Sequence, residues 1–423
     1  MYLAGPMLAT LAVLYAAVLG AQTYAPYGAD IALGIALGAA SIAAMSLTLI
    51  LSTRPRWAEP LFGGLDRMYE VHKWLGIAAL ALMIGHNTFE PELENVVRET
   101  RLGEFASDVG EVAFNGLIGL ILISWIKRIP FTRLELPWSI WRFTHRFTGL
   151  LFAVAALHQF AVDKPSGLDG TLDLYLNALS LAGLAAWLFM QFVAPYLRPR
   201  AFVLENIDRH GSVAEVTLRP EGRALRWRPG QFAFLSAPDA GMAEAHPFTI
   251  ASAPRADGHL RFGIKALGGW TRRLPERLAH GQRLRVEGPY GRFVFRKRAR
   301  RQVWLAGGIG ITPFLAWAEA LTDTDQQEIA LVWVVTTRTE AFAAERLAAI
   351  AARHAGLTVH IVASAEDGRF TAQRLTQLVP PFPLHESELF YCGPTGLRDA
   401  VVSGLQAAGQ RPRRVHHEAF ELR

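Results

Sequence analysis

Apolar residues are distributed unevenly along this chain. Residues 1–197 contain six apolar stretches, each near the length of about 20 residues that a helix needs to cross a bilayer: 4–22, 30–52, 70–89, 111–127, 141–161 and 172–196. The first has no basic segment before it and no clear cleavage motif, so we expect a retained helix rather than a signal peptide. The pattern predicts a six-helix transmembrane bundle at the amino-terminal end.

The pattern changes after residue 197. Residues 201–297 contain short β-rich segments between turn residues, such as "SVAEVTLRP" and "LRFGIKALG", which favour a small antiparallel β-barrel. From residue 303 onward, strands and helices alternate, which predicts an α/β nucleotide-binding fold. We therefore expect a multi-domain chain with three domains, namely 1–197, 198–297 and 298–423.

Charge indicates how the bundle is oriented. Arginine and lysine gather in the stretches 53–73 and 127–146 and just after the sixth stretch, whereas 90–111 is rich in acidic residues. The positive-inside rule then places both termini and the soluble part in the cytoplasm, with the bundle in the inner (plasma) membrane. The single cysteine, Cys392, excludes an intrachain disulfide and a cysteine-based zinc or iron–sulfur site. We expect no nucleic-acid partner.

Four of the 13 histidines lie within the expected membrane helices: His72 and His86 in the third, and His145 and His158 in the fifth. These two helices run in the same direction, and each pair spans about 20 Å of depth. The histidines would thus form two levels, an inner one with His72 and His145 and an outer one with His86 and His158. A haem bound by two histidines suits such a site, whereas zinc needs three or four ligands close together. A single histidine near a helix end would more often be an interfacial residue.

One spacing does not suit a regular helix. Fourteen residues separate His72 from His86, which nearly completes four turns, but 13 residues separate His145 from His158. The sequence leaves two explanations open, an irregularity in the fifth helix or a rotation of one haem plane relative to the other.

The soluble part contains three segments suited to phosphate groups. "HPFTIAS" covers 246–252 and "GGWTRRL" covers 268–274, and the small residues of the second allow close backbone approach to a phosphate. "GGIGITPF" at 307–314 follows a buried strand, with Thr312 as the expected N-cap and Pro313 at the first helical position. This glycine turn is moderate evidence for a dinucleotide site.

The order of the motifs along the chain is more specific than any one of them. Two histidine pairs precede "HPFTIASAP", "GGWT", "GPYG", "GGIGITPF", "YCGP" and a final "HEAF". This order resembles the NADPH oxidase and ferric reductase superfamily over nearly the whole chain. The resemblance implies a ferric reductase-like transmembrane domain followed by a ferredoxin–NADP reductase-like module with an FAD-binding barrel and an NAD(P)H-binding domain.

The resemblance also implies cofactors and contacts. Two haem b groups would be held by the histidine pairs, as described above. The residues implied for FAD are His246, Pro247, Phe248, Thr249, Ser252, Gly269, Trp270 and Thr271. Those implied for the nicotinamide nucleotide are Gly308, Gly310, Thr312, Pro313, Cys392, Gly393 and Pro394. Phe420 matches the carboxy-terminal aromatic residue that stacks on the flavin, and the resemblance implies a catalytic role for Phe420 and Cys392. The alternatives are a plain buried thiol for Cys392 and core packing for Phe420.

The nucleotide is expected to be NADPH, with NADH as the alternative. The extra 2′-phosphate requires arginine or hydroxyl groups, and Arg338 and Arg369 could supply the charge while Thr336 and Thr337 could supply hydroxyls.

The resulting hypothesis is an NADPH oxidase in the membrane. Electrons would pass from NADPH through FAD and the two haems to oxygen on the outer side, giving superoxide. The alternatives are a ferric-chelate reductase and an electron-donating subunit for a periplasmic protein or a quinone. The acidic outer stretch 90–111 disfavours an anionic chelate.

Overall fold

The computed structural model describes the chain except for residues 1–2, 90–96, 98–99, 126–137, 166–169, 380–382 and 419–423. The chain divides into two compact units, Met1–Leu197 and Arg198–Arg423.

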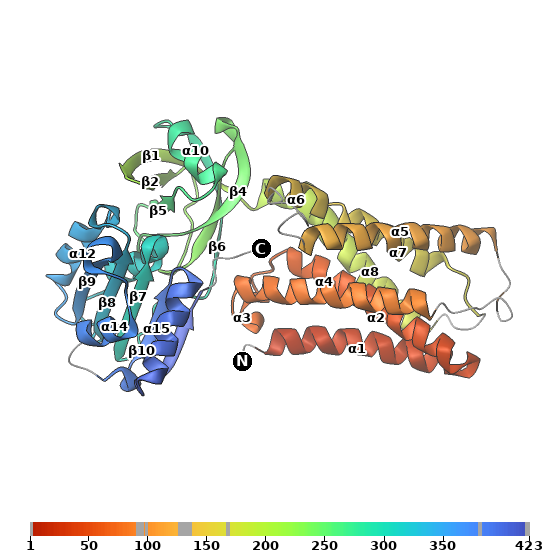
Figure 1. Cartoon of the computed structure of the whole chain (residues 1–423). Coiled ribbons are helices and arrows are strands. Elements are labelled where there is room, and N and C mark those ends of the chain that lie inside the picture. Colours follow the sequence, from red (N-terminus) through yellow and green to blue (C-terminus); the bar gives the residue numbers. More distant parts are fainter. Residues whose placement is uncertain are drawn as a thin grey trace. The chain divides into compact units, whose positions relative to one another are not determined.

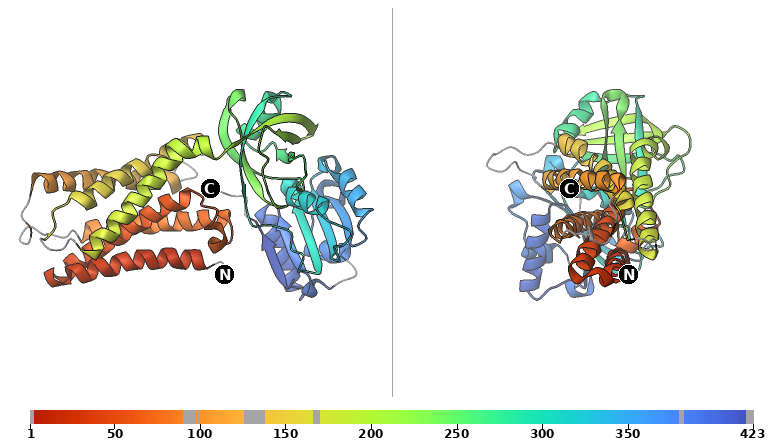
Figure 2. Two further views of the ribbon diagram at one scale, coloured as in Figure 1. Left: turned by 180° about the vertical axis from the view of Figure 1, so that it is seen from behind. Right: turned by 90° about the vertical axis from the view of Figure 1, so that its right-hand side faces the viewer.

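The first unit is helical. Its long helices lie side by side along a common direction (Figure 1), and the right-hand view of Figure 2 shows them gathered into one bundle. They are α1 (Ala4–Tyr24), α2 (Ala29–Ser52), α4 (Leu65–Thr88), α5 (Arg101–Trp125), α6 (Trp138–His145), α7 (Thr148–Ala161) and α8 (Thr171–Leu188). Short helices α3 (Glu59–Phe62) and α9 (Ala194–Leu197) complete the described part, and a π-helical turn, Phe189–Val193, joins α8 to α9.

Four helical segments of the described chain are long and apolar enough to cross a membrane: Ala4–Tyr27, Ala29–Ser52, Arg101–Ser124 and Thr171–Leu197. The remaining two expected spans are α4, which begins with several charged residues, and α6–α7, which is interrupted. Both of these carry the histidines, whose ionisable rings are costly in a bilayer and are usually retained for function. A crossing by α4 and by α6–α7 therefore stays a prediction.

Helix α2 lies at the centre of the bundle because its side chains are small. Ala39, Ala43, Ala44 and Ser46 are all 4% exposed or less. A Cβ added at Gly183 of α8 would lie 3.1 Å from the Cα of Ser46, so the two helices are in close contact. Small residues give membrane helices this kind of backbone-to-backbone packing.

The second unit begins with a six-stranded antiparallel sheet, which confirms the antiparallel arrangement expected for this part. Its strands are β1 (Arg200–His210), β2 (Val213–Pro220), β3 (Phe232–Ala237), β4 (Met242–Thr249), β5 (Leu260–Lys265) and β6 (Arg283–Tyr290), in the order β4-β3-β6-β1-β2-β5. The two edge strands approach each other at a bridge between Ile250 and Phe262. Helix α10 (Gly269–Arg277) follows β5. One isolated bridge does not close the sheet, so the closed barrel stays a prediction.

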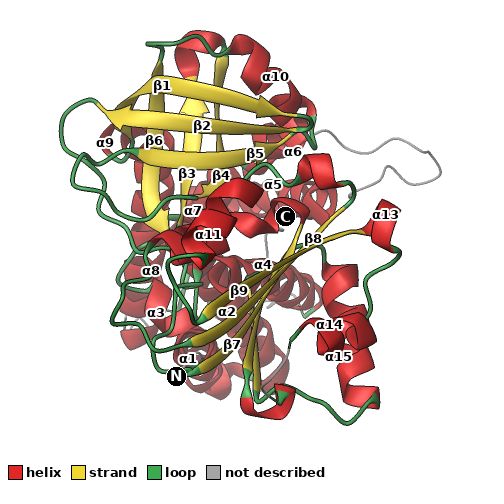
Figure 3. Cartoon of the chain, turned by 90° about the vertical axis from the view of Figure 1, so that its left-hand side faces the viewer, coloured by secondary structure: helices red, strands yellow, loops and turns green. Residues whose placement is uncertain are grey.

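The second sheet of this unit is parallel and five-stranded. It consists of β7 (Arg301–Gly307), β8 (Glu328–Val335), β9 (Leu357–Ala363), β10 (Glu388–Cys392) and β11 (Arg414–His417), in the order β11-β10-β7-β8-β9. Helices on its two faces, seen in Figure 3, are α11 (Thr312–Glu319), α12 (Ala344–Ala351), α13 (Ser364–Asp367), α14 (Ala372–Leu378) and α15 (Thr395–Ala407). The strand order reverses between β7 and β10, and ligands of doubly wound sheets bind outside the strand ends at such a point.

Candidate functional site

The four membrane histidines form two pairs in the structure. The ring centres of His72 and His145 are 6.2 Å apart, and those of His86 and His158 are 6.5 Å apart. Two metal–nitrogen bonds of about 2.0 Å, each extended by about 1.1 Å to the ring centre, would separate two rings by about 6.2 Å. The spacing within each pair therefore suits one metal ion between the rings.

The Nδ1 atom of every one of these rings has a hydrogen-bond partner. The partners are Thr48 O at 2.9 Å for His72, Gly34 O at 2.8 Å for His86, Ala106 O at 2.9 Å for His158 and Ser124 Oγ at 3.0 Å for His145. A carbonyl oxygen only accepts, and the hydroxyl of Ser124 already donates to Leu120 O. Nδ1 is thus the protonated nitrogen, and Nε2 keeps its lone pair for a metal, as is typical of ligating histidines.

An interruption of the fifth expected helix accounts for its irregular histidine spacing. Helix α6 ends at His145, and α7 begins at Thr148. Between them, Arg146 N–H donates to Phe143 O and Phe147 N–H donates to Thr144 O, which are bonds of the 3₁₀ type. This tighter winding turns the chain further per residue, so 13 residues bring the ring around nearly as far as 14 would in a regular helix. Of the two explanations left open by the sequence, the helix irregularity is present.

Two glycines lie directly against the outer histidines. A Cβ added at Gly38 would be 2.8 Å from Nδ1 of His86, and one added at Gly110 would be 2.5 Å from Nδ1 of His158. Each glycine lies four residues after the residue whose carbonyl accepts from that histidine. The absence of a side chain therefore lets each ring reach the backbone of the neighbouring helix.

The flavin-motif residues gather around Trp270. Its ring centre is 4.4 Å from that of His246 and 5.7 Å from that of Phe248. Thr249 Oγ1 and Trp270 Nε1 are both buried and have no hydrogen-bond partner among the described residues. Pro247 lies beside Phe248 on β4. A buried hydroxyl and a buried indole N–H without partners suit a polar cofactor such as a flavin.

The start of α10 is open in front of its first residues. A Cβ added at Gly268 or Gly269 would have no neighbour within 4 Å. The hydroxyl of Thr271 accepts hydrogen bonds from the N–H groups of Leu267 and Gly268, which fixes the turn. The helix N-terminus thus presents backbone groups suited to a phosphate.

The glycine turn after β7 packs against the turn after β10. A Cβ added at Gly310 would lie 2.2 Å from Cys392 O, and Gly393, with φ +153°, lies against Gly307. Gly310 is thus needed for contact between two backbones, whereas a Cβ added at Gly308, with φ +55°, would meet only Lys265 Nζ at 3.9 Å. Pro394 accepts a hydrogen bond from the Tyr391 hydroxyl.

The N-cap of α11 is Ile311, one residue before the predicted Thr312. Thr312 is the first residue of α11 and Pro313 the second, and the hydroxyl of Thr312 donates to Ile309 O. The prediction that Thr312 caps the helix is wrong because a 3₁₀ turn, Gly308–Ile311, leads directly into α11.

Cys392 is fully buried at the end of β10. Burial raises the pKa of its thiol well above the usual value, and the negative charge of Glu418 adds to the effect. The side chain therefore stays a neutral thiol and is no nucleophile. Phe420 lies outside the described residues.

The two candidate arginines for a 2′-phosphate, Arg338 and Arg369, differ in whether they already form ion pairs. Arg338 forms ion pairs with Glu366 at 2.9 Å and with Asp367 at 3.0 Å. Arg369 is exposed and makes no hydrogen bond or ion pair with the residues that the structure describes. Arg369 is therefore the more available of the two for an anionic group.

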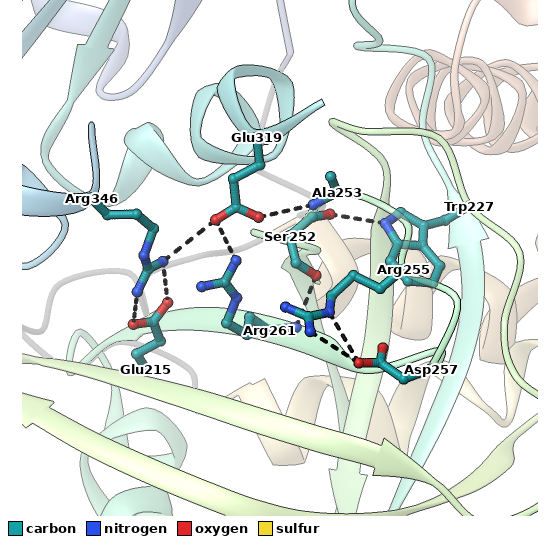
Figure 4. Close-up of polar contacts among 9 residues, drawn as sticks. All are labelled: Glu215, Trp227, Ser252, Ala253, Arg255, Asp257, Arg261, Glu319 and Arg346. Carbon is teal, nitrogen blue, oxygen red and sulfur yellow. Dashed lines mark hydrogen bonds and ion pairs between the residues drawn. The ribbon is translucent and has the colours of Figure 1, made fainter. Parts of the chain in front are cut away.

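Four charged residues that the sequence analysis missed form a network between the two sheets of this unit (Figure 4). They are Glu215 of β2, Arg261 of β5, Glu319 of α11 and Arg346 of α12. Arg346 donates to both carboxylate oxygens of Glu215, each at 2.7 Å. Burial alone would raise the pKa of Glu215, but the hydrogen bonds and charge of Arg346 outweigh it and lower the pKa. Since 131 residues separate the two partners, no local pattern could have indicated the pair.

Three family models match successive parts of the chain. A family described as ferric reductase like transmembrane component matches residues 37–156, an FAD-binding domain matches 202–294, and an oxidoreductase NAD-binding domain matches 304–403. Together the three matches take in most of the chain.

Curated relatives match about half of the chain. The electron transfer component of toluate 1,2-dioxygenase from Pseudomonas putida is 29% identical over 202 residues, which are 46% of this chain and 59% of that protein. The glycine betaine monooxygenase reductase subunit of Pseudomonas aeruginosa is 31% identical over 207 residues, which are 46% of this chain and 56% of that protein. The chain thus spans less than two thirds of the length of these relatives.

Solved structures are less similar. The flavohemoglobin of Malassezia yamatoensis is 17% identical with a TM-score of 0.49, covering 95% of this chain and 98% of that one. The FAD/NAD-binding domain of a nitric oxide dioxygenase from Vibrio cholerae is 23% identical with a TM-score of 0.46, covering 52% of this chain and 98% of that one.

Proposed function

The chain belongs to the NADPH oxidase and ferric reductase superfamily, and from this premise we propose that it is a transmembrane NADPH oxidase that delivers electrons to oxygen on the outer side and produces superoxide. The three matching family models show a membrane-bound oxidoreductase with FAD- and NAD-binding domains. The observation that supports the finer proposal is the presence of two histidine pairs, each spaced for one metal ion, in the same chain as these domains.

Each proposed domain has its own task. Residues 1–197 hold two haem b groups, 198–297 bind FAD, and 298–423 bind the nicotinamide nucleotide. When bound, NADPH would be a hydride donor, FAD would allow the change from two-electron to one-electron transfer, and haem would allow transfer of single electrons. The four histidines would provide Nε2 ligands, and the buried Thr249 hydroxyl, which has no partner among the described residues, would be available to the flavin.

The orientation follows from the charges at the two ends of the bundle. The end that contains His72 and His145 also contains Arg67 and Arg146, and Trp187 Nε1 donates to Arg146 O at that end. The opposite end contains Glu104 and Asp108. The positive-inside rule then places His72 and His145 at the cytoplasmic side, together with both termini.

Oxygen is the electron acceptor that suits the outer end of the helical bundle. If His86 and His158 both ligate the haem iron, a further molecule would have no ligand position, so the acceptor would receive its electron without binding the iron. The outer end carries Glu104, Asp108 and Asp163, which disfavour an anionic ferric chelate and leave a neutral molecule unaffected.

A second candidate is an electron-donating subunit for a periplasmic protein or a quinone. The curated relatives are named as an electron transfer component and as a reductase subunit, so each of them serves a partner. In that case, superoxide would form only slowly.

The test is NADPH-driven reduction of cytochrome c in air, by the purified chain in detergent with added FAD. We expect superoxide dismutase to abolish most of the signal. If the signal resists dismutase, or appears only when a quinone or a ferric chelate is added, the oxidase proposal is wrong.

The nucleotide preference gives a separate prediction. Arg369→Ala is expected to lower kcat/KM for NADPH by about 10- to 100-fold, because a charge-assisted contact to the 2′-phosphate is lost. The value for NADH is expected to change little, since NADH lacks that phosphate. Initial rates with both nucleotides measure the effect.

Two arginine variants serve as controls. Arg374→Ala removes the same charge from α14 and should leave both values unchanged. Arg338→Ala should have a smaller effect than Arg369→Ala, because the guanidinium of Arg338 is already paired with Glu366 and Asp367. An equal loss with NADPH and NADH in Arg369→Ala would contradict the assignment.

A further inference from the structure

Helix α11 contacts the antiparallel sheet and its connecting loops at three separate points. A Cβ added at Gly263 of β5 would lie 2.8 Å from the side chain of Thr312, at the start of the helix. Trp317 donates from Nε1 to Pro229 O at 3.0 Å. Glu319, the last residue of α11, makes the third contact. The helix that begins at the nucleotide turn is therefore fixed along its length to the part that carries the flavin motif.

The carboxylate of Glu319 has partners on both of its oxygens (Figure 4). Oε2 accepts from the N–H of Ala253 at 3.2 Å, and Oε1 accepts from Arg261. Ala253 directly follows the segment 246–252, so one carboxylate connects the flavin segment to the nucleotide helix. Glu319 is 16% exposed, which keeps these charged contacts largely out of water.

The flavin segment is held from other sides as well. Trp227 donates from Nε1 to Ser252 O at 3.0 Å, and the N–H of Arg261 donates to Ser252 Oγ at 3.2 Å. Ser252 and Ala253 are thus fixed by neighbours within the antiparallel sheet and by Glu319 from outside it. A shift of Glu319 would be transmitted to a segment that has little freedom to compensate.

Arg346 extends the network to a second point on the antiparallel sheet. It pairs with Glu215 at 2.7 Å and lies 3.9 Å from Glu319. The charges alternate from Glu215 to Arg346, Glu319 and Arg261. Arg346 and Glu319 come from the nucleotide-binding part, while Glu215 and Arg261 come from the antiparallel sheet.

We propose that Glu319 is a positioning residue for hydride transfer: it fixes the distance between the flavin segment and the glycine turn that holds the nucleotide. This inference rests on the proposed function. Glu319 itself does not touch either cofactor-motif side chain; it acts through Ala253 and through α11. A displacement of about 1 Å at reacting groups can cost about 100-fold in rate, so a carboxylate that joins the two sites can affect the rate without contacting the reactants.

Glu319→Gln tests the proposal, because it keeps the shape of the side chain and removes its charge. The experiment uses the full chain in detergent with its cofactors, ferricyanide as the acceptor, and either NADPH or NADPH carrying two deuterium atoms at C4. We expect kcat to fall roughly 10-fold, KM to stay within about twofold, and the deuterium isotope effect on kcat to rise. The isotope effect rises only if hydride transfer itself has become slower.

Glu221→Gln is the matched control. Glu221 pairs with Arg283 on the exposed surface of the same sheet, and its kcat and isotope effect should equal those of the unchanged chain. A normal kcat in Glu319→Gln would overturn the proposal. So would a lower kcat with an unchanged isotope effect in a variant that keeps its FAD, because the loss would then not lie in hydride transfer.

Glu319→Asp keeps the charge and is the second test of the proposal if the glutamine variant does not retain FAD. Its shorter side chain cannot reach Ala253 and Arg261 together, so it should also raise the isotope effect; an unchanged isotope effect would count against the proposal. If the unchanged chain does not oxidise NADPH at all, the proposed function fails, which is distinguishable from a failure of the Glu319 assignment.

Discussion

Replacement of Gly110 with alanine is expected to remove the outer haem and to leave the inner haem in place. The new Cβ would lie 2.5 Å from Nδ1 and 2.9 Å from Cγ of His158, so the ring must move. Movement breaks the hydrogen bond from Nδ1 to Ala106 O and turns Nε2 away from the outer site. Loss of such a partner typically weakens metal binding by about 10- to 100-fold. The haem-to-protein ratio, measured as the pyridine haemochrome, should fall from two to one.

Gly119→Ala provides the control on the same helix. Both glycines are in α5, but a Cβ added at Gly119 would have no neighbour within 4 Å. The haem content of this variant should be unchanged, and NADPH should reduce the flavin in both variants. Two haems retained in Gly110→Ala would contradict the assignment of His158, whereas haem loss in both variants would point to general damage of the bundle.

The same arrangement recurs elsewhere in the bundle. His86 and His158 each bond to a carbonyl 52 residues earlier, and a glycine follows each of those carbonyl residues by four positions. The residues Gly34, Gly38 and His86 are matched by Ala106, Gly110 and His158, each 72 positions later. Gly38→Ala should therefore repeat the loss of the outer haem. The inner pair departs from the pattern, since the partner of His145 is the hydroxyl of Ser124.

The sequence predicted the features that depend on periodicity and on depth in the membrane. Apolar stretches of the right length become helices because every backbone group must find a partner within the segment. Two histidines on each of two parallel helices then have to lie at matching depths, and the structure brings them together in pairs. The alternation of strands and helices after residue 303 likewise leads to a parallel sheet, with the glycine turn at the carboxyl end of its central strand β7.

Other features depend on contacts between distant residues. Gly310 looks like a phosphate-binding glycine in sequence, but it is also required by the carbonyl of Cys392, 82 residues later. Helix α5 begins at Arg101, ten residues before the apolar stretch, because polar residues can continue a helix beyond the hydrocarbon region. Glu215, which reads as an ordinary strand residue, is only 4% exposed. A single sequence contains no signal for any of these contacts.

Arg346→Met is expected to destabilise the second unit by about 3 kcal/mol at neutral pH. The substitution keeps much of the side-chain volume but leaves the carboxylate of Glu215 buried without its cation. We take the lower end of the range for a broken buried pair because Arg346 is itself 29% exposed. Thermal unfolding of the full chain, followed by the fluorescence of released FAD, measures the loss. Arg283→Met removes an exposed partner of Glu221 and should change the stability little.

The difference in stability between the unchanged chain and Arg346→Met should shrink as the pH falls. In the unchanged chain the folded-state pKa of Glu215 lies below its ordinary value, so this carboxylate stabilises the fold above that ordinary value and loses its contribution as the pH drops through the folded pKa. In Arg346→Met, burial without a cation raises the pKa of Glu215, so protonation relieves the buried charge and recovers stability in acid. The variant thus recovers stability above the ordinary pKa of the carboxyl group, and the unchanged chain loses stability below it, so both changes reduce the stability difference in acid. A stability difference that stays constant from neutral pH down to about pH 4 would show that Arg346 acts through packing alone and that Glu215 is not a buried charge that needs its partner.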